Sequence, residues 1–176
     1  MGNTVEIKAP KAHKLLFATQ ISLRVAAFAS TLAATCIMLT NNQTAVVFDI
    51  QVDARYTYLP ALKFFGFAHL IACVFSIVSL ILTLILGNKA VNPVHYFYMF
   101  LHDLIMSVLL MAGCAAATAV GYIGKYGNTH TGWTPVCDHF AKFCNRVIAA
   151  VVLSFLSVAF YLILTIISAK KYRSTN

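Results

Sequence analysis

FYMFLHDLIMSVLLMAG, residues 97–113, is an almost wholly apolar stretch that carries one acid, Asp103, with His102 just before it. An ionised side chain in the hydrocarbon of a bilayer costs about 2.5–3.5 kcal/mol on insertion scales. If this stretch crosses a membrane, the charge of Asp103 therefore needs a partner elsewhere in the chain. The first question is whether the rest of the sequence places it in a bilayer.

The composition favours a membrane protein. The chain has 176 residues, of which 60% are hydrophobic and only 10% charged, and its mean hydropathy is +0.80. A soluble domain carries about 25% charged residues. The apolar residues fall into four blocks, each as long as the ~20 residues that an α-helix needs to cross the hydrocarbon. We predict an all-α membrane protein, a bundle of four transmembrane helices at about residues 15–39, 64–86, 97–120 and 147–168.

This division sets the domain organisation. Residues 1–14 form an N-terminal tail, residues 15–168 the transmembrane domain and residues 169–176 a C-terminal tail, with outer loops at 40–63 and 121–146. Four spans place both tails on the same side of the membrane. Basic residues are more frequent on that side, which predicts cytosolic termini. They are Lys8, Lys11, Lys14, Lys89, Lys170, Lys171 and Arg173, against Arg55, Lys63, Lys125, Lys142 and Arg146 on the outer side.

The net charge of +8 also bears on the partners. Basic residues gathered at helix ends are typical of contact with a membrane surface. We therefore expect membrane lipids and no nucleic acid as partners.

Arg24 is the basic residue that lies well inside a predicted span, and it answers the question posed by Asp103. At 1.5 Å per residue, Arg24 lies about 14 Å from the start of its span and Asp103 about 9 Å from the start of its own. Spans 1 and 3 run in the same direction, so the two charges have similar depths. We predict an intramembrane ion pair that sets helix register. The alternative is an ion or proton relay, since intramembrane ionisable residues are functional candidates, but arginine does not deprotonate in proteins.

Cys137 and Cys144 lie in the predicted second outer loop, with six residues between them. Outside the cell, two such cysteines are compatible with a disulfide, which we favour. Free thiols and a zinc site that includes His130 or His139 are the alternatives, although the spacing matches no familiar zinc pattern. Asn42 begins an N-glycosylation sequon so close to span 1 that its modification could be blocked.

Small residues recur at four-residue spacing in two spans. Such stripes let helix backbones approach closely. They favour packing within the bundle, with an oligomer interface as the alternative. The residues are Ala26, Ser30 and Ala34 in span 1 and Gly113, Ala117 and Gly121 in span 3.

Motifs for catalysis do not appear in the sequence. It contains no HExxH zinc motif, no glycine-rich phosphate loop and no pair of intramembrane acids. We therefore expect a protein that is not an enzyme and that has no cofactor and no metal site.

The chain resembles the Casparian strip membrane protein-like (CASP-like) family of land plants over nearly its whole length. The resemblance is carried by Arg24, by Asp103, by the stretch ARYTYLPALKFFGFAHLIACVFSI and by the Trp133–Cys137–Phe140–Cys144 pattern. It implies a multi-pass plasma-membrane protein related to MARVEL-type tetraspans, with the family's charged pair at Arg24 and Asp103. It also implies homodimers, heterodimers or larger assemblies with related CASP-like proteins.

Founding members of that family assemble an immobile membrane domain that recruits cell-wall-modifying enzymes. They carry a Glu-Ser-Leu-Pro-Phe-Phe signature where this chain reads TYLPAL at residues 57–62. The chain therefore looks like a CASP-like protein, of the first subgroup, and not like a founding member. We expect a non-enzymatic protein that acts as a membrane-domain scaffold. Its expected partners include cell-wall-modifying enzymes. The alternative is a small transporter or channel subunit that uses Asp103.

Overall fold

The structure is a computed structural model that describes residues 8–47, 49–86 and 93–175. Four long helices run side by side: α1 (Lys8–Leu39), α2 (Pro60–Leu86), α3 (Pro93–Tyr126) and α4 (Ala141–Thr175). Each is long and apolar enough to cross a membrane. The prediction of a four-helix membrane bundle is therefore confirmed, and each predicted span lies inside one of these helices.

The helices are longer than the predicted spans. α3 has 34 residues and α4 has 35, which corresponds to about 50 Å at 1.5 Å per residue, against about 30 Å of hydrocarbon. Hydropathy detects the part of a helix that lies in the bilayer, so it does not detect the turns beyond it. The span bounds themselves stay predictions. The N-terminal tail up to residue 7 and the loop that holds Lys89 lie outside the described residues.

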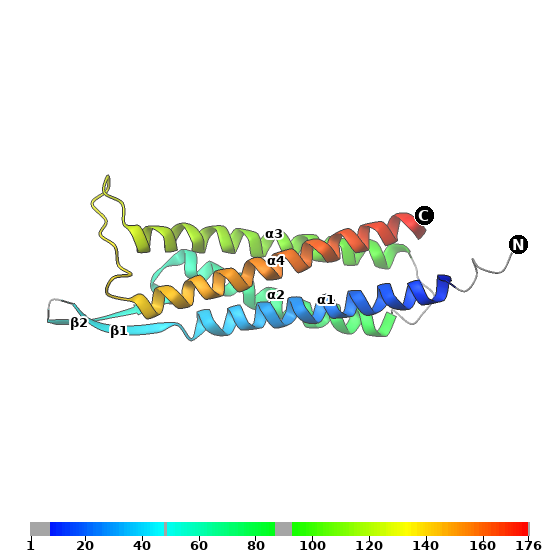
Figure 1. Cartoon of the computed structure of the whole chain (residues 1–176), viewed down its shortest axis with the longest axis horizontal. Helices are drawn as coiled ribbons and strands as arrows, with labels where there is room; N and C mark the ends of the chain where they lie inside the picture. The colour runs from blue at the N-terminus through cyan, green and yellow to red at the C-terminus, as the bar shows by residue number, and fades with distance from the viewer. Residues whose placement is uncertain (1–7, 48, 87–92, 176) are drawn as a thin grey trace, which may run out of the picture.

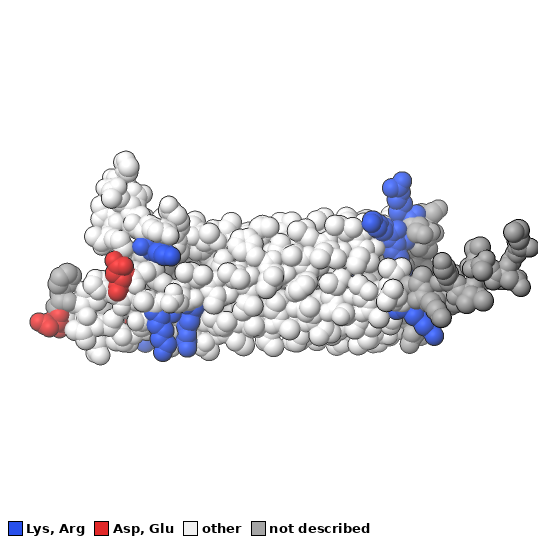
Figure 2. All heavy atoms as spheres, in the orientation of Figure 1, with Lys and Arg blue, Asp and Glu red and all other residues white. Residues whose placement is uncertain are grey.

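The helices are arranged as a ring. α1 packs against α2 and α4, and α3 packs against the same two helices, so α1 and α3 lie diagonally across the bundle. The start of α1 and the end of α4 lie at one end of the bundle, and the two outer connections lie at the other (Figure 1). Basic side chains gather at both ends of the molecule, while the visible middle is free of charge (Figure 2). This distribution fits a molecule whose middle lies in a bilayer.

The first outer connection contains a β-hairpin that the sequence analysis did not anticipate. Strand β1 (Asn42–Val47) pairs antiparallel with β2 (Ile50–Arg55). Asp49 in the turn has a φ of 59°, and aspartate is one of the residues that tolerate this left-handed region. A short 3-10 helix, η1 (Tyr56–Tyr58), then leads into α2. The outer loop predicted at residues 40–63 therefore contains a hairpin, which alternating side chains and a tight turn favour.

Two apolar clusters fill the bundle. One lies toward the hairpin end and includes Met38, Phe65 and Phe143. The other includes Ala72, Leu110 and Tyr161. Large apolar side chains also cover the outside of all four helices, as expected where the solvent is lipid. Examples are Val25, Phe67, Val74, Val108, Val152 and Ile166.

Candidate functional site

The polar core of the bundle centres on Arg24 in α1 and Asp103 in α3. Two parallel contacts join the side chains, Nη1 to Oδ1 at 2.9 Å and Nη2 to Oδ2 at 2.9 Å. Both residues are buried, with 3% and 0% of their surface exposed. Such a two-point pair fixes orientation as well as distance. The sequence analysis paired these two residues from their depths, and the structure places them together.

The diagonal placement of α1 and α3 means that this pair crosses the centre of the bundle. α2 contributes Ser79, whose hydroxyl oxygen accepts a hydrogen bond from Arg24 Nη1 at 2.6 Å. His102 places its Nδ1 3.1 Å from Asp103 Oδ1. The Arg24 guanidinium of α1 therefore bonds to both α2 and α3, and it fixes which faces of these two helices point into the bundle. Nothing in the sequence indicated that Ser79 or His102 would contact the pair.

A second polar group links three helices nearer the hairpin end. His69 in α2 places Nε2 against the Ser154 hydroxyl in α4, and the Cys114 thiol in α3 donates to the same hydroxyl at 2.8 Å. His69 Nδ1 lies 2.8 Å from the Phe65 carbonyl oxygen of its own helix. A histidine, a serine and a thiol together are a familiar nucleophile set. All three side chains are fully buried, however, so their contacts join helices and give a substrate no access.

The small-residue stripes lie at helix contacts within the chain. A Cβ added at Gly113 would lie 3.5 Å from the Phe65 Cα, so α3 and α2 approach closely there. Ser30 in α1 accepts a hydrogen bond from Ser157 in α4 at 2.7 Å. Ala34 and Ala117 are fully buried, and Ala26 is partly buried. A Cβ added at Gly121 would lie 4.0 Å from Val147 Cγ1 of α4.

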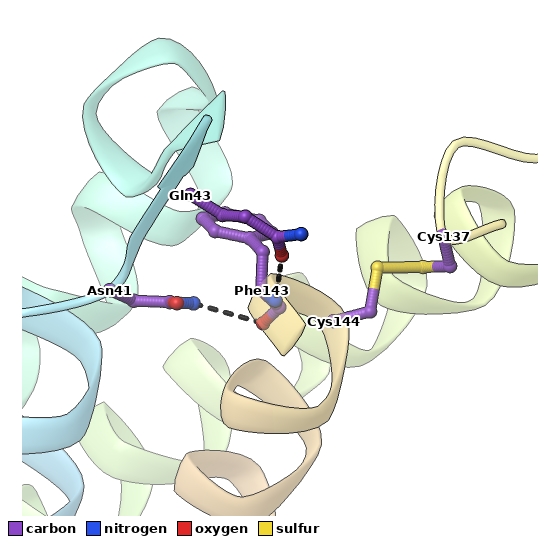
Figure 3. The surroundings of a disulfide bond; sticks show 5 residues. All are labelled: Asn41, Gln43, Cys137, Phe143 and Cys144. Carbon is purple, nitrogen blue, oxygen red and sulfur yellow. Dashed lines mark hydrogen bonds between the residues drawn. A yellow bond between two sulfur atoms is a disulfide. The ribbon is translucent and has the colours of Figure 1, made fainter. Parts of the chain in front are cut away.

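The outer end of the molecule is tied together at Phe143, in the first turn of α4 (Figure 3). The Phe143 N–H donates to the Gln43 side-chain oxygen at 2.7 Å. Its carbonyl oxygen accepts from the Asn41 amide at 3.0 Å. Asn41 and Gln43, at the start of the hairpin, thus bind the backbone C=O and N–H of Phe143. The first N–H groups of a helix have no partner within the helix, so Gln43 caps one of them. We call these two contacts the Phe143 clamp. The sequence did not indicate this clamp, because Asn41 and Gln43 bind the backbone of Phe143 and not its side chain.

Cys137, in the second outer loop, and Cys144, in the first turn of α4, lie beside this clamp. The structure joins Cys137 to Cys144, with 5.8 Å between their Cα atoms (Figure 3). The remaining cysteines, Cys36, Cys73 and Cys114, have free thiols. Among the residues that the structure describes, no group of three histidine, cysteine or acidic side chains could hold a metal ion. The pairing itself stays a prediction for the protein in its membrane.

The hairpin carries a small charged cluster at the outer surface. Asp53 accepts hydrogen bonds from the Tyr58 hydroxyl at 2.9 Å and from Arg55 Nε at 2.8 Å. The hydrogen bond from Tyr58 lowers the pKa of Asp53, with a further contribution from Arg55. The same contact raises the pKa of Tyr58. Asn42, the sequon residue, is exposed at the start of β1.

These features define a class: a four-span membrane protein with an ion pair across its core and an ordered outer end. The chain matches the Casparian strip membrane protein domain over residues 13–160, and it belongs to that family. The sequence-based identification as a CASP-like protein is therefore confirmed. Multi-pass membrane localisation follows from the family and from the four apolar helices.

Several plant proteins are similar along nearly the whole chain. CASP-like protein 1F1 of Ricinus communis is 50% identical, over 94% of this chain and 93% of its own length. CASP-like protein 1F2 of Populus trichocarpa is 45% identical, over 93% and 90%. CASP-like protein 1F1 of Vitis vinifera is 46% identical, over 92% and 78%. A comparison with solved structures gave no match.

Proposed function

We propose that this chain is a non-enzymatic scaffold of the plasma membrane that assembles laterally with its own copies and with related CASP-like proteins. Its termini lie in the cytosol, and its outer end displays contacts to partners, cell-wall-modifying enzymes among them. The proposal goes beyond the family assignment, which rests on the match to the Casparian strip membrane protein domain and on relatives named CASP-like proteins.

The observation that carries the proposal is how the buried polar side chains are used. Arg24, Asp103 and Ser79 contact one another across the core, and His69, Cys114 and Ser154 do the same. Groups engaged in this way hold helices together and are not free for chemistry. Many large apolar side chains are exposed on all four helices, which suits lateral contact with lipid and with other helices.

The outer end supports the display of partner contacts. The hairpin is held to α4 through Phe143, and the second loop is held by the Cys137–Cys144 bond. An ordered surface binds a partner with a smaller loss of conformational entropy than a flexible loop would. The disposition of lysines and arginines favours placing this end outside the cell.

Self-association is tested by expressing two copies of the chain with different tags in one plant membrane. We expect each tag to co-purify the other in mild detergent, and we expect single-molecule photobleaching to show more than one step per particle. A matched control is an unrelated four-span protein expressed at the same level. Single-step bleaching at all expression levels would contradict the proposal.

The competing function, transport through Asp103, makes a different prediction. It requires substrate flux in proteoliposomes that disappears in Asp103→Asn while the protein stays folded. Under the scaffold proposal, purified protein adds no flux of protons or small ions beyond that of empty vesicles. Flux that depends on the Asp103 carboxylate would replace the scaffold proposal with transport.

A further inference from the structure

A cavity of about 720 Å³ lies at the outer end of the bundle. The last part of the hairpin and the start of α2 form one wall, and the outer ends of α3 and α4 with the loop between them form the others. The volume falls in the range of about 300–1,000 Å³ that is typical of small-molecule sites. None of the helix contacts described above fills this cavity.

Apolar groups line most of the cavity. Leucine, valine, isoleucine and aromatic side chains form the walls, and glycines of α3 leave one wall flat. These residues include Leu59, Leu62, Phe140, Val147, Ile148 and Gly121. A lining of this kind binds a ligand that is apolar over most of its length.

The cavity runs from the level of the bilayer to the outer water. Val120 and Ile148 lie within helices able to span the membrane, and Ile148 is 46% exposed on its surface. Asp53 and Arg55, which also line the cavity, belong to strand β2 of the hairpin at the outer end of the molecule. A ligand therefore has direct access from the outer leaflet, and its polar end would meet the hairpin.

The polar side chains at the outer rim of the cavity indicate which polar group the ligand carries. Arg55 is engaged by Asp53, and the Lys125 ammonium lies 5.4 Å from the centre of the Tyr126 ring. Asp53 offsets the charge of Arg55, so the hairpin side of the rim carries no net charge that would hold a phosphate. The Asp53 carboxylate has lone pairs for more hydrogen bonds than the two it accepts. A small uncharged head with a hydroxyl donor fits this site.

We infer that this cavity binds a membrane sterol from the outer leaflet. The sterol's ring system lies among the apolar side chains of α2, α3 and α4, and its hydroxyl donates to Asp53. A sterol combines a rigid apolar body with one hydroxyl, as the lining and the rim require. The inference concerns a ligand of the outer end, and it does not depend on self-association.

Trp133 makes the test direct, because it lines the cavity and is the single tryptophan of the chain. The full chain is reconstituted in phosphatidylcholine vesicles with dehydroergosterol, a fluorescent sterol that accepts energy from tryptophan. We expect energy transfer from Trp133 that saturates with sterol, that falls when unlabelled sitosterol competes, and that weakens when the sterol hydroxyl is methylated.

Gly121→Leu fills the cavity without straining the backbone, since a Cβ there would meet only Val147 Cγ1, at 4.0 Å. We expect sterol binding about tenfold weaker, the change that a clash of about 1.4 kcal/mol produces. The matched control is Ala119→Leu, which adds the same side chain to an exposed position of α3 outside the lining, and which should bind as the natural chain does.

Three results would overturn the inference. The first is energy transfer that rises linearly with sterol and does not compete, as random mixing in the bilayer would give. The second is equal transfer in Gly121→Leu and in the natural chain, with circular dichroism showing both folded. The third is quenching of Trp133 by brominated phosphatidylcholine that added sterol does not relieve, which would assign the cavity to a phospholipid acyl chain.

Discussion

Removing either side chain of the Arg24–Asp103 pair leaves the other as an unpaired charge in the core of the bundle. Breaking a buried pair in this way typically costs 3–5 kcal/mol. We expect Arg24→Ala and Asp103→Ala each to lower the free energy of unfolding by about that amount. Thermal unfolding in detergent and the amount of folded protein in the membrane measure the effect.

The charge swap and an apolar swap test why the pair is present. Arg24→Asp combined with Asp103→Arg should recover part of the loss. Arg24→Met combined with Asp103→Leu should also fold, because apolar replacements of a buried pair are often neutral. The control is Lys63→Ala, which removes an exposed lysine and should change little. Double variants no more stable than the single ones would contradict the pairing.

Tyr58 and Asp53 give a pH-dependent contact at the outer surface. The pKa of Asp53 is lowered, first by the Tyr58 hydroxyl, from its ordinary value of 3.8. The contact therefore stabilises the hairpin above that pH and is lost as the pH falls through the lowered pKa. Tyr58→Phe should raise the pKa of Asp53 toward its ordinary value. Carboxyl carbon NMR of the chain labelled at aspartate measures this, and an unchanged Asp53 titration would contradict it.

At the residue scale, the sequence predicted the charged pair but not its surroundings. Arg24 and Asp103 were recognisable because a charge in an apolar span is rare and its depth can be counted. Ser79 and His102 were not, since a serine or a histidine in an apolar span does not by itself indicate a charged partner. Asn41 and Gln43 escaped notice because hydrogen bonds to backbone leave no pattern in the sequence.

Among the elements, the junction between the hairpin and α4 has the most specific contact. Gln43→Ala removes the acceptor of the Phe143 N–H. Loss of a helix N-terminal cap costs about 0.5–2 kcal/mol, so the first turn of α4 should open more often. We expect amide hydrogen exchange at Phe143 to be about tenfold faster, the equivalent of about 1.4 kcal/mol.

Gln51→Ala is the matched control, because Gln51 lies on the neighbouring strand and is exposed. It should leave exchange in α4 unchanged. Equal effects of the two substitutions, or none from either, would show that the Gln43 side chain does not cap the start of α4. The Asn41 contact would also keep part of the junction in place in Gln43→Ala, so the hairpin itself should persist.

The four helices could be predicted from the sequence, whereas the hairpin of the first outer connection could not. Membrane spans are set by the length of apolar sequence, which can be read directly. The hairpin depends on a local turn and on the neighbouring end of α4, and hydropathy over a long window averages such short strands away. The same averaging explains why the helices extend past the predicted spans.

For the whole molecule, the number of helices and the shared side of the termini followed from the sequence. The order of the helices around the ring did not, because it depends on packing among side chains from all four. The structure places α1 and α3 on a diagonal, so the ion pair acts through the centre of the bundle and involves α2 as well. The cavity at the outer end arises only from this assembled arrangement.

The central claim is that the protein forms a laterally assembled membrane domain, and lateral mobility tests it most directly. The chain is expressed in plant cells with a small fluorescent tag on its C-terminal end, and fluorescence recovery after photobleaching is recorded beside a monomeric four-span protein. The account predicts discrete patches with slow and incomplete recovery. Uniform distribution with recovery as fast and complete as that of the monomeric protein would contradict it.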